Sequence, residues 1–353
     1  MSKGELMGML KCASFFAGVG GIDIGFEGFG NEKSDTFEVI YANELDPYPV
    51  KTYELNSSIK VDQRDIRRAA EAAATIPDFD VLLAGFPCQA FSIAGYRKGF
   101  DDEKGRGTLF FELIKIIRVK KPSVVFLENV KNLVGHNNGD TFATILDALE
   151  KEGYTSKYAV LNAMEYGNIP QNRERIYIVG FLDPEKAEKF TMPDPVPLTT
   201  KISDVIDFRT EVDKKYYYTD GKYKGDIYEK LTGEMNTQDT VFQWRRHYVR
   251  RNMSGVVPTL TANMGEGGHN VPLILTDNGI RKLTPHECFN VQGFPKDFRL
   301  PEDMTESRLY KQAGNSVCVS VIARIADQIK KVLSITPPHK ETGLAKGPGS
   351  RYG

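Results

Sequence analysis

One cysteine of this chain stands where the sequence could support nucleophilic chemistry. Cys88 follows Phe86 and Pro87 at the end of a short apolar run, residues 81–85. Such a run, closed by glycine and proline, is typical of a buried parallel strand, because proline cannot donate to the ladder. We therefore expect Cys88 at the carboxyl end of a central strand, where open α/β sheets place their ligands. The plain alternative is a buried structural thiol.

Two more ionisable groups flank predicted strands. Glu128 follows directly on a second apolar run, so its carboxyl group is expected at the same edge of the sheet. Arg173 and Arg175 stand just before the strand predicted over residues 176–181. These two arginines could equally form a surface ion pair with Glu174.

The elements that must position these residues alternate along the first half of the chain. Apolar runs predict strands and amphipathic stretches predict helices, as in a Rossmann-like sheet. A glycine-rich turn joins the first strand to the first helix, where the backbone can approach a ligand that a Cβ atom would block. The predicted strands are residues 10–16, 37–42, 59–61, 81–85, 123–127, 158–161 and 176–181, and the predicted helices are residues 67–75, 108–119 and 141–152.

Acidic residues follow the second and third predicted strands. Glu44 comes about 20 residues after the glycines, where a carboxylate can accept hydrogen bonds from ribose hydroxyls. Asp46 precedes Pro47 and is the better candidate for a helix N-cap. Asp65 could contact an adenine edge or cap the following helix, and the residues alone leave both alternatives open.

The composition is that of an ordinary globular protein. The 353 residues are 41% hydrophobic and 26% charged, and the formal net charge is −1. Nucleic-acid binding would therefore need a local basic face. The four cysteines lie far apart without a CxxC pair, which argues against a zinc site or a disulfide framework and suits a reducing cytosol. No apolar run approaches the length that a bilayer requires, and the start shows no signal-peptide pattern, so we expect a cytoplasmic protein.

Six motifs, taken together, make this sequence similar to the C5-cytosine DNA methyltransferases. Any one of them is weak, but they follow the family's order and spacing and cover nearly the whole chain outside a central variable block. The resemblance implies an α/β fold, with a Rossmann-like S-adenosylmethionine-dependent methyltransferase sheet and a smaller, mostly irregular or β target recognition domain. The motifs are residues 16–21 (FAGVGG), 85–89 (GFPCQ), 128–130 (ENV), 171–175 (QNRER), 281–285 (RKLTP) and 312–317 (QAGNSV).

The resemblance implies methyl transfer to C5 of a cytosine in a specific double-stranded DNA sequence. Cys88 would add to C6 as a thiolate, which turns the poorly nucleophilic C5 into an enamine carbon. Glu128, with its pKa raised by burial, would share a proton with N3 of the ring. Arg175 would bind the cytosine carbonyl oxygen. Arg173 would hold the surroundings of Cys88 or contact the DNA backbone.

The implied cofactor is S-adenosylmethionine, with S-adenosylhomocysteine as its product, and no metal is expected. Its sulfonium group is cationic and it carries no phosphates, so a Walker-type lysine is not required. The residues carried over as its pocket are Phe16, Gly18, Val19, Gly20, Gly21, Glu44, Leu45, Asp65, Ile66, Phe86, Leu109, Asn315 and Val317.

A cytosine stacked in a duplex hides its C6 atom, so the target base must be flipped out of the helix. Residues 90–107 form a polar, glycine-containing stretch that resembles the family's mobile loop and would close over the flipped base. Ala94 stands where some members carry serine, so a hydroxyl contact is absent at that position. The DNA contacts expected from this region are Gln89, Ser92, Arg97 and Lys98.

From residue 182 to residue 279 the alternation of strands and helices breaks down, which indicates a separate small domain. In the family this region holds the target recognition domain. Residues 243–252 interleave arginines with aromatic residues and carry no acid, which makes a local anion-binding face; the plain alternative is a solvated charged edge strand. Arginine, asparagine and glutamine read guanine and adenine edges in the major groove. The candidates for DNA contact are Gln243, Arg245, Arg246, Arg250, Thr259, Asn263 and His269.

The predicted catalytic domain is discontinuous in the sequence. Thr284 is expected to cap a helix over residues 285–290, and the last helix is expected over residues 317–333. The predicted parts are residues 1–181 (catalytic), 182–280 (target recognition), 281–336 (return to the catalytic domain) and 337–353 (a disordered tail or cloning remnant).

Three other functions compete with this prediction. A tRNA cytosine C5 methyltransferase shares the Pro-Cys-Gln site, although the long basic insert favours duplex DNA. A DNA-binding protein with a degenerate methylase fold is disfavoured by the intact Cys88, Glu128 and Arg175. A nicotinamide dehydrogenase rests on the glycine-rich turn alone. We expect a monomeric enzyme without membrane association, either solitary or paired with a restriction endonuclease that its activity does not need.

Overall fold

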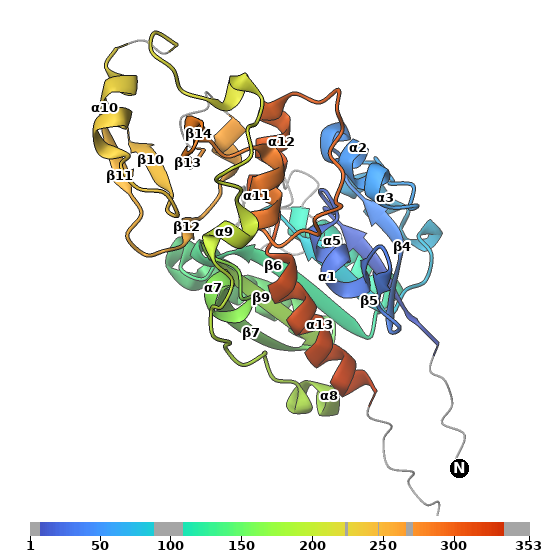
Figure 1. Cartoon of the computed structure of the whole chain (residues 1–353). Coiled ribbons are helices and arrows are strands. Elements are labelled where there is room, and N and C mark those ends of the chain that lie inside the picture. The colour runs from blue at the N-terminus through green and yellow to red at the C-terminus, as the bar shows by residue number, and fades with distance from the viewer. Residues whose placement is uncertain (1–7, 88–108, 223–224, 246, 266–270, 335–353) are drawn as a thin grey trace, which may run out of the picture.

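A computed structural model describes residues 8–87, 109–222, 225–245, 247–265 and 271–334 of the chain. A six-stranded mixed sheet, in the order β4-β1-β5-β6-β9-β7, organises its larger part (Figure 1). β4 (Phe37–Asn43), β1 (Leu10–Phe15), β5 (Val81–Gly85) and β6 (Val124–Val130) run parallel, while β9 (Glu174–Phe181) is antiparallel to both β6 and β7 (Thr155–Asn162). The carboxyl ends of β1, β5 and β6 therefore meet at one edge.

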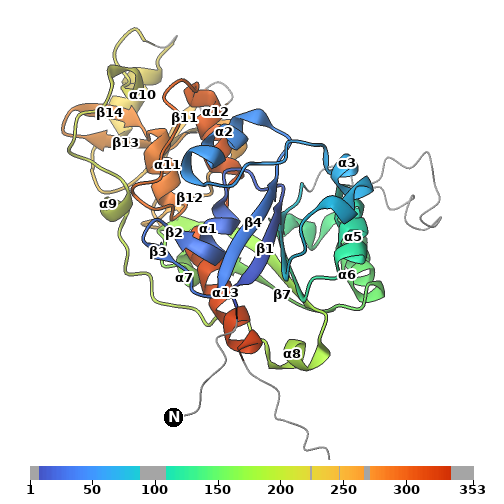
Figure 2. The same ribbon diagram turned by 90° about the vertical axis from the view of Figure 1, so that its right-hand side faces the viewer.

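Helices cover both faces of this sheet (Figure 2). α1 (Gly21–Glu27) and α13 (Val319–Leu333) pack on one face, and α3 (Ile66–Glu71), α5 (Leu109–Lys120) and α6 (Asp140–Lys151) pack on the other. Strands that are buried on both faces read as continuous apolar runs in the sequence, which explains why most of them were predictable. The mixed α/β architecture confirms the predicted fold class.

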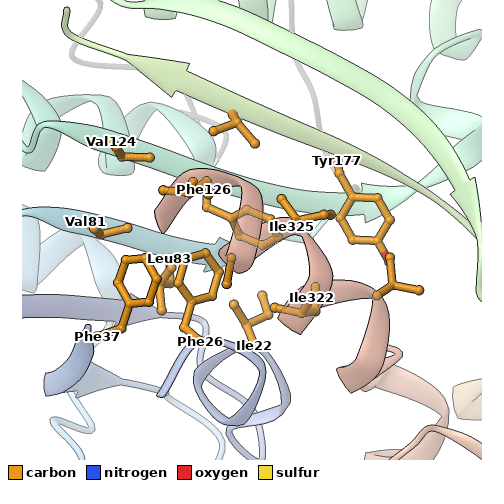
Figure 3. Packing of buried hydrophobic residues seen from close by; sticks show 14 of the residues in the cluster. Ile22, Phe26, Phe37, Val81, Leu83, Val124, Phe126, Tyr177, Ile322 and Ile325 are labelled. Atoms are coloured by element: carbon orange, nitrogen blue, oxygen red, sulfur yellow. The ribbon is translucent and has the colours of Figure 1, made fainter. Parts of the chain in front are cut away.

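The core between the sheet and α13 is tightly packed. Figure 3 shows Phe26 of α1 and Ile322 of α13 packed with Leu83 and Phe126 of the central strands. A Cβ atom at Gly25 would lie 2.4 Å from Cγ2 of Ile322, so α1 can approach α13 this closely only with glycine there.

A second, four-stranded antiparallel sheet has the order β11-β10-β13-β14. Its strands are β10 (Phe242–Arg245), β11 (Tyr248–Arg251), β13 (Leu273–Thr276) and β14 (Gly279–Lys282), and α10 (Ile227–Glu234) packs on one of its faces. In Figure 1 this sheet lies apart from the central sheet, with α11 and α12 between them. The boundary predicted between residues 280 and 281 falls inside β14.

The remaining helices and strands are short or connect the two sheets. The helices are α2 (Pro47–Asn56), α7 (Ala163–Tyr166), α8 (Pro184–Lys189), α9 (Ile202–Val205), α11 (Pro285–Val291) and α12 (Glu306–Asn315). The paired short strands are β2 (Gly28–Phe29) with β3 (Glu32–Lys33) and β8 (Gln171–Asn172) with β12 (Val257–Pro258). The 3₁₀ helices are η1 (Ala73–Thr75), η2 (Lys131–Leu133), η3 (His136–Gly139), η4 (Lys214–Tyr216) and η5 (Ala262–Gly265).

The strand predicted over residues 59–61 is wrong. The chain makes only an isolated bridge between Asn43 and Asp62 there. Side chains, rather than a neighbouring strand, accept the backbone donors of this segment: the N–H of Val61 donates to Oε1 of Glu54 (3.0 Å), and the N–H of Ile59 donates to Oγ of Ser57 (3.1 Å). The helix predicted over residues 67–75 is also divided into α3 and η1.

The predicted cap of α11 is confirmed. The backbone N–H of Glu287 donates to Oγ1 of Thr284 (3.2 Å), and the backbone N–H of Thr284 donates to the Glu287 carboxylate (2.8 Å). This reciprocal capping box satisfies two backbone donors that a helix start would otherwise leave free.

Candidate active site

Glu128 lies beside the strand that leads to Cys88. It pairs in register with Gly85, the last residue of β5. A Cβ atom at Gly85 would lie 3.6 Å from Oε2 of Glu128, so the carboxyl group sits directly against this backbone. Phe86 and Pro87 continue the chain, and Cys88 itself lies outside the described residues. The parallel pairing of β5 and β6 thus brings Glu128 to the predicted edge.

Glu128 and Arg175 form a buried ion pair. Nε of Arg175 lies 3.2 Å from Oε1 of Glu128, and their side chains are 12% and 10% exposed. The antiparallel pairing of β6 with β9 places Arg175 opposite Val130, two residues along from Glu128. Burial raises the pKa of Glu128 above its ordinary value, while the charges of Arg175 and Arg173 oppose that rise. A carboxyl group in this setting can hold a proton more readily than one in water.

Glu174 does not pair with the two arginines through its side chain. Its carboxylate lies 2.8 Å from Nζ of Lys131, and both side chains are largely exposed. Arg175 donates to the backbone oxygen of Glu174 (2.8 Å) in addition to its pairing with Glu128. The surface ion pair considered as the alternative for Arg173 and Arg175 is therefore wrong.

Arg173 is buried and links separate segments of the chain through hydrogen bonds to their backbone oxygens. Its side chain is 2% exposed, and its guanidinium group donates to the backbone oxygens of Leu260 (2.8 Å), Gly314 (3.1 Å) and Ser316. Burial lowers the pKa of Arg173 to about 9. This placement excludes the DNA-backbone contact that was one of its two predicted roles, because no exposed group remains to make it. Arg173 instead joins three segments around the predicted site.

Asn129 was not assigned a role from the sequence, but it fixes the chain that enters Cys88. Its amide donates to the backbone oxygen of Phe86 (2.7 Å), and its Oδ1 accepts the N–H of Val130 (2.8 Å). The side chain is buried at the end of β6. Its position directly after Glu128 was the only signal that the sequence offered.

The glycine-rich turn forms the second part of the site. Phe16 (φ 52°), Gly18 (φ 56°) and Gly20 (φ 84°) all adopt left-handed backbone conformations. The N–H of Gly18 donates to Oε2 of Glu44 (3.0 Å), which ties the turn after β1 to the end of β4. A Cβ atom at Gly18 would meet nothing within 4 Å, so the turn borders open space there. Leu45, beside Glu44, is 58% exposed.

A segment from the far end of the chain closes the turn on its other side. A Cβ atom at Gly21 would lie 2.8 Å from Oγ of Ser316 and 3.0 Å from Cγ2 of Val317. Asn315, at the end of α12, is exposed beside them. The structure therefore brings together the glycines, Glu44, Asn315 and Val317, which the sequence assigned to one pocket, and adds Ser316 beside them.

The other residues predicted to line the cofactor pocket differ in how far their side chains are buried. The side chain of Val19 is buried in the cluster formed with α11 and α12, so its backbone is the part left to face a ligand. Ile66 and Phe86 are buried, and Leu109 is half-buried at the start of α5. Asp65 accepts the N–H of Arg67 (2.9 Å) and caps α3, which bears out the capping alternative.

Asp46 has the role that was favoured for it. Its Oδ1 accepts the backbone N–H of Tyr48 (3.0 Å) at the start of α2. Glu44 is therefore not required as a helix cap. Burial raises the pKa of the Glu44 carboxyl group, while the N–H groups of Asp46 and Gly18 oppose that rise.

Two buried glutamines extend the contacts of Arg173, and we call Gln171, Arg173 and Gln292 the buried polar junction. Nε2 of Gln171 donates to the backbone oxygen of Val291 (2.8 Å), and its Oε1 accepts the N–H of Leu260 (3.2 Å). Nε2 of Gln292 donates to the backbone oxygen of Ala313 (2.8 Å). This junction joins β8 to the segment before η5 and to α11 and α12. The motif at residues 171–175 indicated Gln171, but nothing in the sequence pointed to Gln292.

The hairpin of β10 and β11 brings three predicted DNA-contacting residues onto one face. Gln243 pairs with Arg250, and Arg245 pairs with Tyr248. Because side chains alternate along a strand, these four lie opposite Trp244 and its neighbours, which pack toward α10. Nη2 of Arg245 donates to Oε1 of Gln243 (3.0 Å), and Tyr248 is 60% exposed. We call these four residues the hairpin face.

The side of the second sheet that carries the hairpin face is exposed to solvent at the hairpin. Farther along the same side of the sheet, Ile274 and Arg281 are fully buried. Arg281 makes a two-point ion pair with Glu287 (2.8 Å for each contact), so the motif at residues 281–285 supports α11. The hairpin face thus projects beyond the covered part of the sheet.

Two other predicted DNA contacts lie between the two sheets. Thr259 is exposed, but its hydroxyl group donates to the backbone oxygen of Asn172 (2.6 Å) and joins β12 to β8. Asn263 is exposed on η5. Cys88 and the predicted DNA contacts Gln89, Ser92, Arg97, Lys98, Arg246 and His269 lie outside the described residues.

The three cysteines within the described residues, Cys12, Cys288 and Cys318, are structural thiols. All three are buried and form no disulfide. Burial raises the pKa of each thiol. Within the described residues, no group of three or more His, Cys, Asp or Glu side chains is arranged to hold a metal ion. No helix in the same part of the chain is long and apolar enough to cross a membrane.

The chain is similar to a known protein family and to curated relatives over most of its length. Residues 10–331 match the family model described as C-5 cytosine-specific DNA methylase. The type II methyltransferase M.Bsp6I of Bacillus sp. (strain RFL6) is 57% identical over 323 residues, which covers 92% of this chain and 99% of the relative. The type II methyltransferase M.NlaX of Neisseria lactamica is 39% identical over 332 residues, which covers 94% of this chain and all (100%) of the relative.

A solved structure shares the fold. The Entamoeba histolytica methyltransferase EhMeth superimposes with a TM-score of 0.65 at 19% sequence identity, covering 93% of this chain and 100% of that one. At this identity the likeness shows the fold alone.

Proposed function

Since this chain belongs to the C-5 cytosine-specific DNA methylases, and is thus a DNA cytosine-C5 methyltransferase, we propose how it acts. It methylates C5 of a flipped cytosine in one specific duplex sequence, through a covalent bond between Sγ of Cys88 and C6 of the ring. The buried pair of Glu128 and Arg175 carries this proposal. It stands where β5 leads into Cys88, so a thiolate, a proton-holding carboxyl group and a guanidinium group can face one ring.

The addition step uses all three groups. The Cys88 thiolate donates an electron pair to C6, and the ring electrons move toward C5 and N3. Glu128 provides the proton that N3 takes up, which keeps negative charge from building on the ring. Arg175 donates to the carbonyl oxygen of the base. C5 becomes an enamine carbon and is then a competent nucleophile.

Loss of the C5 proton and elimination of Cys88 restore the aromatic ring. After C5 has gained its methyl group, a base takes the proton from C5. The electron pair of that C–H bond forms the C5–C6 double bond again. The C6–S bond breaks, Cys88 leaves as a thiolate, and N3 returns its proton to Glu128.

The described residues fit S-adenosylmethionine. The open space beside Gly18 would be narrowed by any side chain, and the half-buried Glu44 carboxylate is placed to accept from ribose hydroxyls. Leu45 offers an exposed apolar surface for the adenine ring, and Asn315 and Val317 border the glycine-rich turn. When bound, the cofactor supplies an electrophilic methyl group.

DNA recognition is assigned to the part of the chain that holds the second sheet. The hairpin face presents two arginines and a glutamine, residue types that read guanine and adenine edges. We propose residues 182–280 as the target recognition domain and residues 1–181 with 281–336 as the catalytic domain. The enzyme acts as a cytoplasmic monomer, and a partner endonuclease is not needed for methyl transfer.

Bisulfite sequencing of plasmid DNA incubated with the protein and S-adenosylmethionine tests this function. We expect protection of one cytosine within one short sequence, and no protection by Cys88→Ser. Transfer of labelled methyl groups to tRNA but not to duplex DNA would overturn the DNA assignment. No transfer to either substrate would overturn the function altogether.

A further inference from the structure

A buried carboxyl group that the reaction does not use lies behind the glycine-rich turn. Asp23, in the first turn of α1, is 4% exposed. We propose that Asp23, acting through Tyr53, is a positioning residue that fixes the glycine-rich turn in the conformation that binds the cofactor. This inference rests on the proposed S-adenosylmethionine site and adds a residue that lies outside its lining.

Asp23 joins three elements that surround the turn. Oγ of Ser14 in β1 donates to Oδ1 of Asp23 (2.6 Å), and the Tyr53 hydroxyl in α2 donates to Oδ2 (2.7 Å). Ser14 and Tyr53 are 1% and 3% exposed, so both hydrogen bonds are shielded from water. The carboxylate thus receives one donor from the strand before the turn and one from the helix that follows Glu44.

Tyr53 transmits this anchoring to the turn by packing. A Cβ atom at Gly20 would lie 2.9 Å from Cε2 of the Tyr53 ring, so the ring rests directly on the Gly20 backbone. Gly20 has a left-handed conformation (φ 84°), and its N–H donates to the backbone oxygen of Ala17 (2.9 Å). The hydrogen bond to Asp23 holds the ring in place, and the ring supports the left-handed backbone at Gly20.

The position of Asp23 is costly for a purely structural residue. Burial raises its pKa to about 6, although the hydroxyl groups of Ser14 and Tyr53 oppose that rise. Nearby Glu27 adds a further unfavourable charge. A neutral side chain of similar shape would avoid this cost, which favours a positioning role for the carboxylate alongside its hydrogen bonds to Ser14 and Tyr53.

Isothermal titration with S-adenosylhomocysteine, together with steady-state kinetics, tests the proposal. We expect Asp23→Asn and Tyr53→Phe each to weaken binding about tenfold, equivalent to ~1.4 kcal/mol. KM for S-adenosylmethionine should rise by a similar factor, while kcat at saturating cofactor and duplex DNA affinity change little. The double variant should bind S-adenosylhomocysteine about as tightly as whichever single variant has the lower affinity, because the two residues act as one unit.

Tyr154→Phe is the matched control. It removes a buried tyrosine hydroxyl that donates to the backbone oxygen of Pro122 (2.7 Å), away from the glycine-rich turn. We expect it to lower stability and leave cofactor affinity unchanged. Wild-type affinity in both Asp23→Asn and Tyr53→Phe would overturn the inference while leaving the function intact. Failure of the wild-type protein to bind the cofactor would instead overturn the proposed function.

Discussion

At the scale of single residues, the site depends on carboxyl groups that are kept from water. Glu128 is buried beside Arg175, and burial raises its pKa. Asp23 is buried beside two hydroxyl groups, and burial raises its pKa as well. Their environments assign different tasks: Glu128 stands at the edge where the base would enter, whereas Asp23 lies behind the turn that borders the cofactor.

Glu128→Gln should lower the single-turnover methyl-transfer rate by about 10²–10³-fold, because an amide cannot pass a proton to N3. Cofactor affinity should remain near that of the wild type. Glu174→Gln is the control, since the side chain of Glu174 pairs with the exposed Lys131 and, among the described residues, with no group of the candidate site. A Glu128→Gln enzyme as fast as the control would show that the carboxyl group takes no part in proton sharing.

The stability of the protein should depend on pH through Asp23. Its folded-state pKa of about 6 lies above the ordinary value of 3.8, so the folded state binds the proton more tightly. The contribution of Asp23 is therefore fully present below pH ~4 and is lost as the pH rises through ~6. At about 1.36 kcal/mol for each pKa unit, the loss amounts to ~3 kcal/mol.

Urea unfolding of the wild type and Asp23→Asn at several pH values measures this effect. Surface carboxyl groups far from Asp23 are present in both proteins, so their contributions cancel in the difference. The free energy of unfolding of the wild type should fall relative to that of Asp23→Asn as the pH rises from 4 to 7. A difference that does not change with pH would show that the Asp23 pKa is unshifted.

At the scale of elements, strands buried on both faces were predictable because their sequences are continuous apolar runs. β5 and β6 were found with nearly correct bounds, and with them the placement of Glu128 beside the chain leading to Cys88. The strand at residues 59–61 failed because the side chains of Glu54 and Ser57, rather than a neighbouring strand, accept the N–H groups of Val61 and Ile59. An apolar pattern does not show which acceptors the backbone donors of a segment will find.

Arg173 shows the same limit within the site. Its motif was recognised, but its partners are backbone oxygens of Leu260, Gly314 and Ser316. Backbone acceptors leave no signature in a sequence. The role of Asn129 in holding Phe86 was missed for a related reason, because only the fold brings these two residues together.

Gly314→Ala tests the contact between α12 and η5. The new Cβ atom would lie 2.1 Å from the backbone carbon of Thr261, so the two segments must separate. Overpacking of this kind costs about 1–3 kcal/mol in the free energy of unfolding. Since Arg173 donates to the backbone oxygen of Gly314, we also expect weaker methyl transfer at equal enzyme concentration.

Gly233→Ala is the matched glycine control, because it lies inside α10 with open space at its Cβ position. This substitution should raise the free energy of unfolding by about 0.4–1 kcal/mol. Chemical denaturation of both variants compares the two sites directly. Equal stability of the two proteins would mean that α12 does not need glycine where it meets η5.

At the scale of the whole molecule, a net charge of −1 leaves DNA attraction to local surfaces. The hairpin face is such a surface, because Arg245 and Arg250 are exposed on the hairpin, beyond the covered part of the second sheet. In the proposed function the central sheet carries the chemistry and the hairpin face contacts the DNA. The buried polar junction joins β8, α11, α12 and the segment before η5.

Arg245→Gln and Arg250→Gln should weaken DNA binding without changing cofactor affinity. A lost phosphate contact lowers the slope of log affinity against log salt concentration by about 0.9, whereas a lost base contact relaxes sequence preference instead. Fluorescence anisotropy over a range of salt concentrations separates the two effects. Lys157→Gln, an exposed change on β7, serves as the control. Unchanged affinity and sequence preference in both arginine variants would remove the hairpin face from the DNA contact.

The covalent bond between Cys88 and the target cytosine is the central claim, and a mechanism-based trap tests it most directly. A duplex that carries 5-fluorocytosine at the mapped position cannot lose its C5 substituent, so the reaction should stop after methyl transfer. Mass spectrometry after incubation with S-adenosylmethionine should show a protein–DNA adduct, with the DNA attached to the peptide that contains Cys88. Cys88→Ser should form no adduct while still binding the duplex. Turnover of the natural site by the wild type, without any adduct on the fluorinated duplex, would contradict the covalent mechanism.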